Sequence, residues 1–129
     1  YLICRNREVC QKIARQLPEW NLSVFAQMAG CAAAKEMEFI GESRKLIKEQ
    51  RSILTKELIS LGFRVYPSRA DYILFYTELP LYELLLKKQI LIRNCENYRG
   101  LSKGYYRIAV RGQAENERLI SALREVTEK

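Results

Sequence analysis

Histidine is absent from the 129 residues of the sequence. For the chain by itself, this absence excludes Ser-His and Cys-His nucleophilic catalysis, histidine-containing zinc sites and acid–base chemistry by imidazole. No apolar run approaches the roughly 20 residues that span a bilayer, so we expect no membrane partner. The chain also lacks a basic segment followed by a small-residue cleavage site, and a signal peptide is therefore not expected.

Closely spaced cysteine pairs are missing as well. The four cysteines lie at irregular positions and none belongs to a CxxC pair: Cys4, Cys10, Cys31 and Cys95. Two disulfides are arithmetically available, but Cys31 lies in the apolar run AGCAAAK, where a buried free thiol is the ordinary interpretation. The sequence therefore favours a reduced, cytoplasmic protein without a metal site.

The composition is that of a globular protein, with 48% hydrophobic and 29% charged residues. A length of 129 residues is close to that of one domain. The chain opens with YLICR, which has the pattern of the middle of a strand, and its first methionine is Met28. We therefore expect it to be part of a longer protein.

Positive charge is unevenly distributed along the chain, whose formal net charge is +7. The net charge is +3 over residues 1–35, zero over 36–61 and +4 over 62–129. Within the last stretch, five basic residues face Glu96 alone: Arg93, Arg99, Lys103, Arg107 and Arg111. A function that needs positive charge is therefore expected in the segment 93–111.

The first half of the sequence predicts a strand over 1–5 and two helices. Asn6 is a suitable N-cap for a helix over 7–17 that Pro18 ends. A long helix is expected over 22–61, beginning at Asn21 or Ser23 and ending at Gly62. Its second part repeats apolar residues near a 3.6-residue period, which predicts a buried face at Ile40, Ile47, Leu54, Leu58 and Leu61.

The second half has the patterns of four strands and two helices. Strands are predicted over 63–67, 70–76, 90–93 and 105–111, a helix from Pro80 to about 89, and a final helix over 113–126. The segment 94–104 reads as a loop. The expected fold is a small α/β unit in which helices pack on a sheet, attached through the long helix.

The strand 105–111 carries the most informative pattern. Side chains alternate along a strand, so Tyr106, Ile108 and Val110 share one face and Arg107 lies on the other. An arginine in the centre of a strand built for burial is costly unless it meets an anion. Arg93 ends the preceding strand in the same manner. Two converging guanidiniums would form a fork for a carboxylate or a phosphate.

Two other interpretations of these basic residues remain open. Both arginines could lie on a solvated sheet face, where most charged residues are found. The tyrosines among the basic residues are also compatible with a stand-alone basic module that binds nucleic acid. The chain lacks an RNP-type run and a helix-turn-helix signature, and acidic residues are interleaved outside 93–111. We therefore expect no nucleic-acid partner.

Two long runs carry a family resemblance: LGFRVYPSRADYILF, and LYELLLKKQILIRNCENYRGLSKGYYRIAVRGQAENERLISAL. They closely resemble the C-terminal domain of fold-type I, pyridoxal-phosphate-dependent aminotransferases of class I/II. Within that superfamily, the chain is most similar to the histidinol-phosphate aminotransferase and threonine-phosphate decarboxylase branch. The most specific part of this similarity is the set of pieces ILIRNC, GL, YYRIAVR and EN. PEWNLSVFAQMA resembles the segment that enters the interdomain helix of that family. The resemblance, which extends over essentially the whole chain, implies the small C-terminal domain of the aspartate-aminotransferase-like fold.

The resemblance also implies roles for individual residues. Arg107 falls on the arginine that such enzymes use to bind the substrate's α-carboxylate or another substrate anion. Arg93 falls on a second arginine of the same pocket, near the substrate phosphate in the phosphate-using members. Asn21 lies in the segment that approaches the mouth of the active site, and Arg99 lies in the loop between the two arginine strands. Both are possible pocket residues.

The resemblance further implies what the chain does not contain. The Schiff-base lysine, the aspartate that faces the pyridine nitrogen and the groups that hold the cofactor phosphate would all precede Tyr1. We therefore expect residues 1–36 to be the end of a large domain and the start of the interdomain helix, and 37–129 to be the small domain. No catalytic and no cofactor-binding residue is expected here, so the chain alone should be inactive and bind no pyridoxal phosphate.

The intact protein would be an enzyme, a homodimer, with an amino-acid or phosphoamino substrate. The sequence does not choose between a transaminase and a decarboxylase. A regulatory domain derived from the same fold, in which the arginines sense a ligand, is a further alternative.

Overall fold

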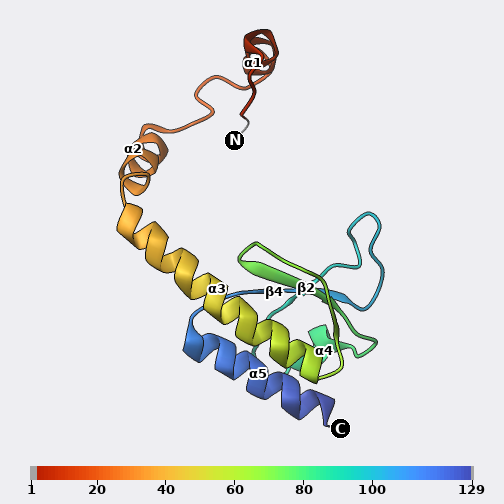
Figure 1. Cartoon of the computed structure of the whole chain (residues 1–129). Coiled ribbons are helices and arrows are strands. Elements are labelled where there is room, and N and C mark those ends of the chain that lie inside the picture. Colours follow the sequence, from red (N-terminus) through yellow and green to blue (C-terminus); the bar gives the residue numbers. More distant parts are fainter. Residues whose placement is uncertain (1–2, 129) are drawn as a thin grey trace. The chain divides into compact units, whose positions relative to one another are not determined.

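The computed structural model describes residues 3–128, which fall into two compact units (Figure 1). The first unit extends to Phe39 and the second begins at Ile40. No helix of the residues described is long and apolar enough to cross a membrane. The two units are described separately below.

The first unit begins with helix α1, Arg7–Ala14. The Asn6 side chain caps it as predicted, because its Oδ1 accepts hydrogen bonds from the amides of Glu8 (2.9 Å) and Val9 (3.2 Å). The helix ends three residues before the predicted end. Leu17 precedes a proline, which disfavours helical backbone there, and its amide bonds to the carbonyl three residues earlier.

The predicted strand 1–5 is wrong where it can be inspected. Tyr1 and Leu2 lie outside the described residues, and Ile3–Arg5 form no strand. A strand needs a hydrogen-bonded neighbour, and none of the paired strands in the described part of the chain pairs with this segment.

The predicted continuous helix 22–61 is also wrong, because it is interrupted after residue 33. Helix α2, Val24–Ala33, is capped by the Ser23 hydroxyl, and helix α3 runs over Met37–Ser60. Between them, the amides of Lys35 and Glu36 bond to carbonyls three residues back, which tightens the turn and ends the α-helical ladder. None of the residues of α2 is buried.

The expected burial of Cys31 is also wrong. This cysteine is free, but it lies exposed on α2 instead of buried. Its small apolar neighbours indicated burial, yet α2 has no buried face in the residues described. The cysteine that is buried is Cys95.

The second unit contains a four-stranded antiparallel sheet in the order β1-β2-β4-β3. Its strands are β1 (Arg64–Val65), β2 (Tyr72–Tyr76), β3 (Arg93–Asn94) and β4 (Tyr105–Ala109). Helix α4 (Leu81–Leu86) connects β2 to β3, and helix α5 (Gln113–Thr127) follows β4. The predicted order of elements is confirmed from α3 onwards, although every strand is shorter than predicted.

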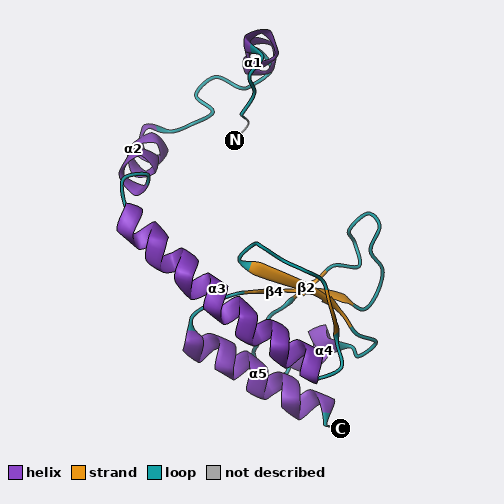
Figure 2. Ribbon diagram, in the orientation of Figure 1, coloured by secondary structure: helices purple, strands orange, loops and turns teal. Residues whose placement is uncertain are grey.

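One face of the sheet packs against the helices (Figure 2). Ile73 and Phe75 of β2 and Ile108 of β4 join α3, α4 and α5 in a single apolar core. The predicted alternation in β4 is confirmed, since Tyr106, Ile108 and Val110 are all buried. The predicted face of α3 is confirmed except at its start: Leu54 and Leu58 are fully buried, and Ile47 and Leu61 pack against the core. Ile40 is only half-buried and is not part of this core.

Gly62 ends α3 as predicted. Its φ of 81° is left-handed, and the Phe63 amide donates to the Leu58 carbonyl at 3.0 Å, which is the bond that closes a Schellman motif. This turn directs the chain from α3 into β1.

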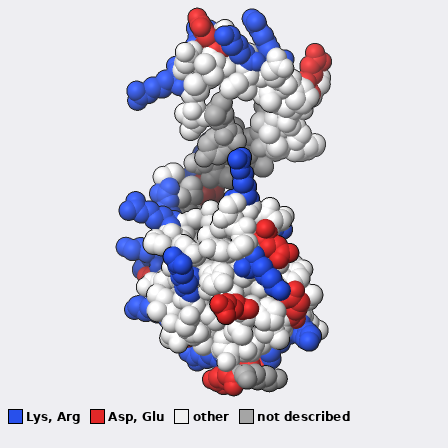
Figure 3. All heavy atoms as spheres, turned by 90° about the vertical axis from the view of Figure 1, so that its right-hand side faces the viewer, with Lys and Arg blue, Asp and Glu red and all other residues white. Residues whose placement is uncertain are grey.

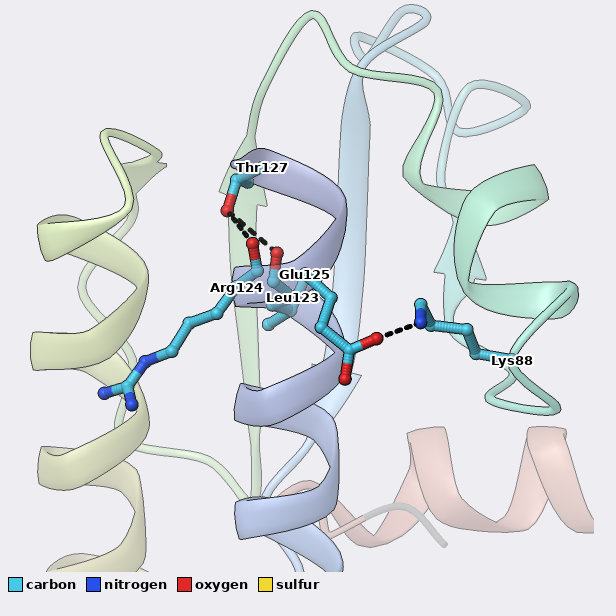
Figure 4. Close-up of polar contacts among 5 residues, drawn as sticks. All are labelled: Lys88, Leu123, Arg124, Glu125 and Thr127. Carbon is cyan, nitrogen blue, oxygen red and sulfur yellow. Dashed lines mark hydrogen bonds and ion pairs between the residues drawn. The ribbon is translucent and has the colours of Figure 1, made fainter. Parts of the chain in front are cut away.

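Polar contacts fasten α5 to its neighbours. The buried Asn116 side chain donates to the Gln50 Oε1 of α3 (2.9 Å) and to the Arg111 carbonyl (2.7 Å), and accepts from the Arg111 amide. Lys88 forms an ion pair with Glu125 (Figure 4), and Arg124 forms another with Glu57 of α3 at 2.6 Å. The helices therefore form a fixed support beneath the sheet.

Candidate functional site

The opposite face of the sheet is lined by tyrosines and arginines. Residues that alternate with the buried ones project there: Tyr72, Leu74 and Tyr76 of β2, Tyr105 and Arg107 of β4, and Arg93 of β3. The core and the three helices of this unit lie on the other side. We call this surface the open face.

Arg93 and Arg107 are the centre of the open face. They are directly opposite each other in the antiparallel pair of β3 and β4, so their Cβ atoms are about 5 Å apart. The register thus brings the two arginines of the predicted fork to facing positions on one side of the sheet. Their joint role in binding an anion stays a prediction. Within residues 3–128, neither guanidinium forms an ion pair with a carboxylate. Two like charges opposite each other are destabilising, and an anion between them would relieve the repulsion.

Aromatic rings support both guanidiniums. The Cζ of Arg107 lies 4.9 Å from the ring centroid of Tyr72, and the Cζ of Arg93 lies 5.3 Å from that of Tyr98. The Nη2 of Arg93 also donates to the Oδ1 of Asn97 at 3.2 Å. Each contact has the geometry of a cation–π interaction.

Cys95 lies close enough to Arg93 and Arg107 for both charges to affect the pKa of its thiol. Burial raises the pKa of its thiol, and the Arg107 and Arg93 guanidiniums act in the opposite direction. Because burial is the larger effect, the thiol stays neutral at pH 7 and does not serve as a counter-ion for the pair.

The loop between β3 and β4 is anchored at Gly104. Its φ is 94°, and a Cβ there would lie 2.7 Å from both the Thr77 carbonyl oxygen and a ring carbon of Tyr76. The Thr77 amide donates to the Gly104 carbonyl at 3.0 Å. Only glycine fits this close approach, which fixes the start of β4 and hence the position of Arg107.

Three tyrosines form a separate cluster on the open face. The hydroxyls of Tyr66 and Tyr105 are hydrogen-bonded at 3.2 Å, and the rings of Tyr76 and Tyr105 have centroids 5.0 Å apart. The hydrogen bond that the Tyr66 hydroxyl donates to Tyr105 is the main cause that raises the pKa of Tyr66. These rings contact one another and form one half-buried aromatic cluster.

The other two predicted pocket residues are not joined to the pair. Arg99 is exposed in the loop between β3 and β4, and no contact of its side chain is recorded within the described range. Asn21 is exposed in the first unit, between α1 and α2. Their roles stay predictions.

Tyr72 is the residue that sequence reasoning missed. A strand is predicted from the sequence over 70–76, but no faces were assigned to it; the alternation of the buried Ile73 and Phe75 with Tyr72 is the signal that could have found this residue. What the pattern did not supply was the pairing of β2 with β4, which brings Tyr72 beside Arg107.

Comparison with known proteins decides the family. The model of aminotransferase class I and II matches residues 1–123. The chain belongs to this aminotransferase family. It is 35% identical to the threonine-phosphate decarboxylase of Salmonella typhimurium, over 98% of this chain and 36% of that enzyme. The resemblance inferred from the sequence is thereby confirmed.

Solved structures confirm the fold. The histidinol-phosphate aminotransferase of Clostridium acetobutylicum superposes with a TM-score of 0.88 and 34% identity, over 95% of this chain and 39% of that one. The L-threonine-O-3-phosphate decarboxylase of Porphyromonas gingivalis gives a TM-score of 0.78 and 25% identity, over 96% and 40%. The chain thus spans little more than a third of the length of these aminotransferase relatives.

Intact aminotransferases of this family use pyridoxal phosphate, and the residues described here do not by themselves fit that cofactor. An imine-forming lysine needs a desolvated site that lowers its pKa. Lys35, Lys45 and Lys103 are exposed, and no lysine lies on the strands of the open face. The feature of the described residues that remains to be explained is the pair of facing arginines, Arg93 and Arg107.

Proposed function

We propose that this chain supplies the substrate-anion-binding half of the active site in a pyridoxal-phosphate-dependent aminotransferase or amino-acid phosphate decarboxylase. The observation that carries the proposal is the pair of opposed arginines, Arg93 and Arg107, for which no carboxylate partner is present in residues 3–128. A fold gains nothing from two such charges unless a ligand joins them.

The two arginines have different surroundings and are assigned different tasks. Arg107 is half-buried in the middle of β4, next to both neighbouring strands, and would bind the substrate's carboxylate through two parallel N–H donors. Arg93 is more exposed, at the edge strand, and would reinforce the clamp or bind a second anionic group such as a phosphate. Arg99, in the loop between the two arginine strands, would be a further candidate for contact with the substrate.

The remainder of the active site would come from a larger domain of the same protein. Under the proposal, residues 37–129 form the small domain, and 1–36 form the end of the large domain and the start of the interdomain helix. The intact enzyme would be a homodimer in the cytoplasm, would hold the cofactor through residues outside this chain, and would act on an amino acid or phosphoamino acid. The chain alone would be inactive.

The decisive experiment is steady-state kinetics of Arg107→Ala in the intact enzyme. Loss of a bidentate, charge-assisted contact of about 3 kcal/mol should lower kcat/KM about 100-fold. The absorbance of the bound cofactor should be unchanged. Arg64→Ala is the matched control, because Arg64 also lies over a tyrosine ring on this sheet but outside the pair. An unchanged kcat/KM in Arg107→Ala would overturn the proposal.

The nucleic-acid alternative is addressed by a gel shift over a range of salt concentrations. On the side of the molecule seen in Figure 3, acidic side chains lie among the basic ones rather than leaving a continuous basic surface. The expected result is no tight binding to single- or double-stranded probes. Tight binding that is lost steeply with salt would favour the alternative.

A further inference from the structure

Each arginine of the pair lies against a tyrosine that reaches it from another part of the second unit. We propose that Tyr72 and Tyr98 are positioning residues, which hold the Arg107 and Arg93 guanidiniums in the orientation that receives the substrate anion. This inference rests on the proposed function of the arginine pair.

Strand pairing brings Tyr72 to Arg107. On β2, Tyr72 is opposite Ala109 and Leu74 is opposite Arg107, so Tyr72 is the diagonal neighbour of Arg107 on the same face. Diagonal neighbours are about 7–8 Å apart at their backbones, within reach of long side chains. The guanidinium carbon lies 4.9 Å from the ring centroid, and this contact restricts the arginine to rotamers that follow the ring.

A turn brings Tyr98 to Arg93. The Tyr98 amide donates to the Cys95 carbonyl at 3.0 Å, and the Leu101 amide donates to the Tyr98 carbonyl at 3.0 Å, so the backbone of Tyr98 is held on both sides. The guanidinium carbon of Arg93 lies 5.3 Å from the Tyr98 ring centroid, and Asn97 accepts a hydrogen bond from its Nη2. Tyr98 and Asn97 thus hold the same guanidinium from one loop.

The chemistry of the contact leaves the donors free. A ring attracts the guanidinium through its π-electrons, whereas the five N–H donors of arginine lie in the guanidinium plane. A carboxylate partner would occupy those donors, and a tyrosine ring does not. The tyrosine contacts therefore hold the arginines without using their N–H groups, and the only recorded hydrogen bond of either guanidinium in residues 3–128 is the one from the Arg93 Nη2 to Asn97.

The tyrosine hydroxyls are not what holds the arrangement. Across residues 3–128, neither the Tyr72 nor the Tyr98 hydroxyl is recorded in a hydrogen bond, and the two residues are 42% and 37% exposed. The ring, not the hydroxyl, makes the contact. Phenylalanine should therefore replace either tyrosine, and an aliphatic side chain should not.

The test is a kinetic series in the intact enzyme with Tyr72→Leu, Tyr98→Leu and the two Phe variants. Without the ring, the guanidinium can leave the orientation that binds the anion. Binding of the substrate is then weakened equally in the ground state and in the transition state, so KM should rise about tenfold in each Leu variant. kcat should stay within about twofold, and each Phe variant should return KM to within about twofold of the unsubstituted enzyme. Tyr66→Leu is the matched control, since Tyr66 lies beneath Arg64 and outside the pair.

Other outcomes separate this inference from the proposed function. If Arg107→Ala loses activity while both Leu variants keep their KM, the positioning role is wrong and the anion clamp stands. If the Phe variants are as impaired as the Leu variants, the hydroxyl acts and the inference is again overturned. If neither the arginine nor the tyrosine variants change kinetics, both proposals fail. Tyr72→Thr and Tyr98→Met repeat the test should a Leu variant not fold, and the same KM rise is expected.

Discussion

One face of the four-stranded sheet is filled by Ile73, Phe75, Tyr106 and Ile108 against three helices, whereas the other presents arginines and tyrosines. The two faces belong to the same strands and alternate residue by residue. The covered face is stabilised by burial of apolar surface. The open face places two like-charged residues, Arg93 and Arg107, opposite each other, which burial of apolar surface does not explain. The covered face accounts for the fold, and under our proposal the open face serves to bind a ligand.

The largest expected difference between the two faces is in stability, and two adjacent residues of β2 test it. Phe75 is fully buried, and Leu74 is on the open face. Phe75→Ala should lower the free energy of unfolding of the chain by about 4 kcal/mol, since a large cavity is left in the core. Leu74→Ala, one position away, should cost less than about 1 kcal/mol. Urea unfolding measures the free energy of unfolding of both variants. Equal losses of stability in the two would contradict the division into two faces.

Asn116 tests whether the support beneath the sheet is held by more than apolar packing. Its side chain is 2% exposed and joins α5 to Gln50 of α3 and to the backbone of Arg111. Asn116→Ala should lower the free energy of unfolding by about 2 kcal/mol, because Gln50 is left buried without its partner. Ser121→Ala, an exposed position on the same helix, serves as the control and should be neutral. A neutral Asn116→Ala would show that apolar packing is sufficient.

The open face should respond to anions where the covered face does not. With a dissociation constant of about 10 mM, phosphate at about 50 mM should stabilise the chain by about 1 kcal/mol relative to sodium chloride of equal ionic strength. The double substitution Arg93→Gln/Arg107→Gln should abolish this gain, and Arg64→Gln should retain it. A gain that survives the double substitution would place the anion elsewhere. Thermal unfolding in the two salts provides the measurement.

Much of the second unit was predictable from local patterns. The Gly62 helix end, the Pro80 start of α4 and the alternation at Tyr106, Ile108 and Val110 are all as predicted, because each depends on neighbouring residues in the chain. Arg93 and Arg107 were expected to lie near each other because of their positions on two successive strands, and the register places them opposite each other on β3 and β4. Convergence of their guanidiniums on an anion stays a prediction.

The errors arose where the local pattern gave no clear signal. The break between α2 and α3 is a tight turn in which the amides of Lys35 and Glu36 bond to carbonyls three residues back, and the small residues before Lys35 gave no sign of it. Cys31 was expected to be buried from apolar neighbours alone. Tyr72 was missed as a partner of Arg107 because strand register is a long-range property.

The measurement that tests the central claim most directly is the free energy of unfolding and kcat/KM of one variant, Arg107→Leu. Leucine keeps an apolar contact with Tyr72 and removes the charge opposite Arg93. Urea unfolding of the chain should show a free energy unchanged or higher by about 0.5 kcal/mol, since a like-charge pair is relieved. In the intact enzyme, kcat/KM should fall about 100-fold. A variant that loses stability while keeping kcat/KM would show that Arg107 serves the fold and not a ligand.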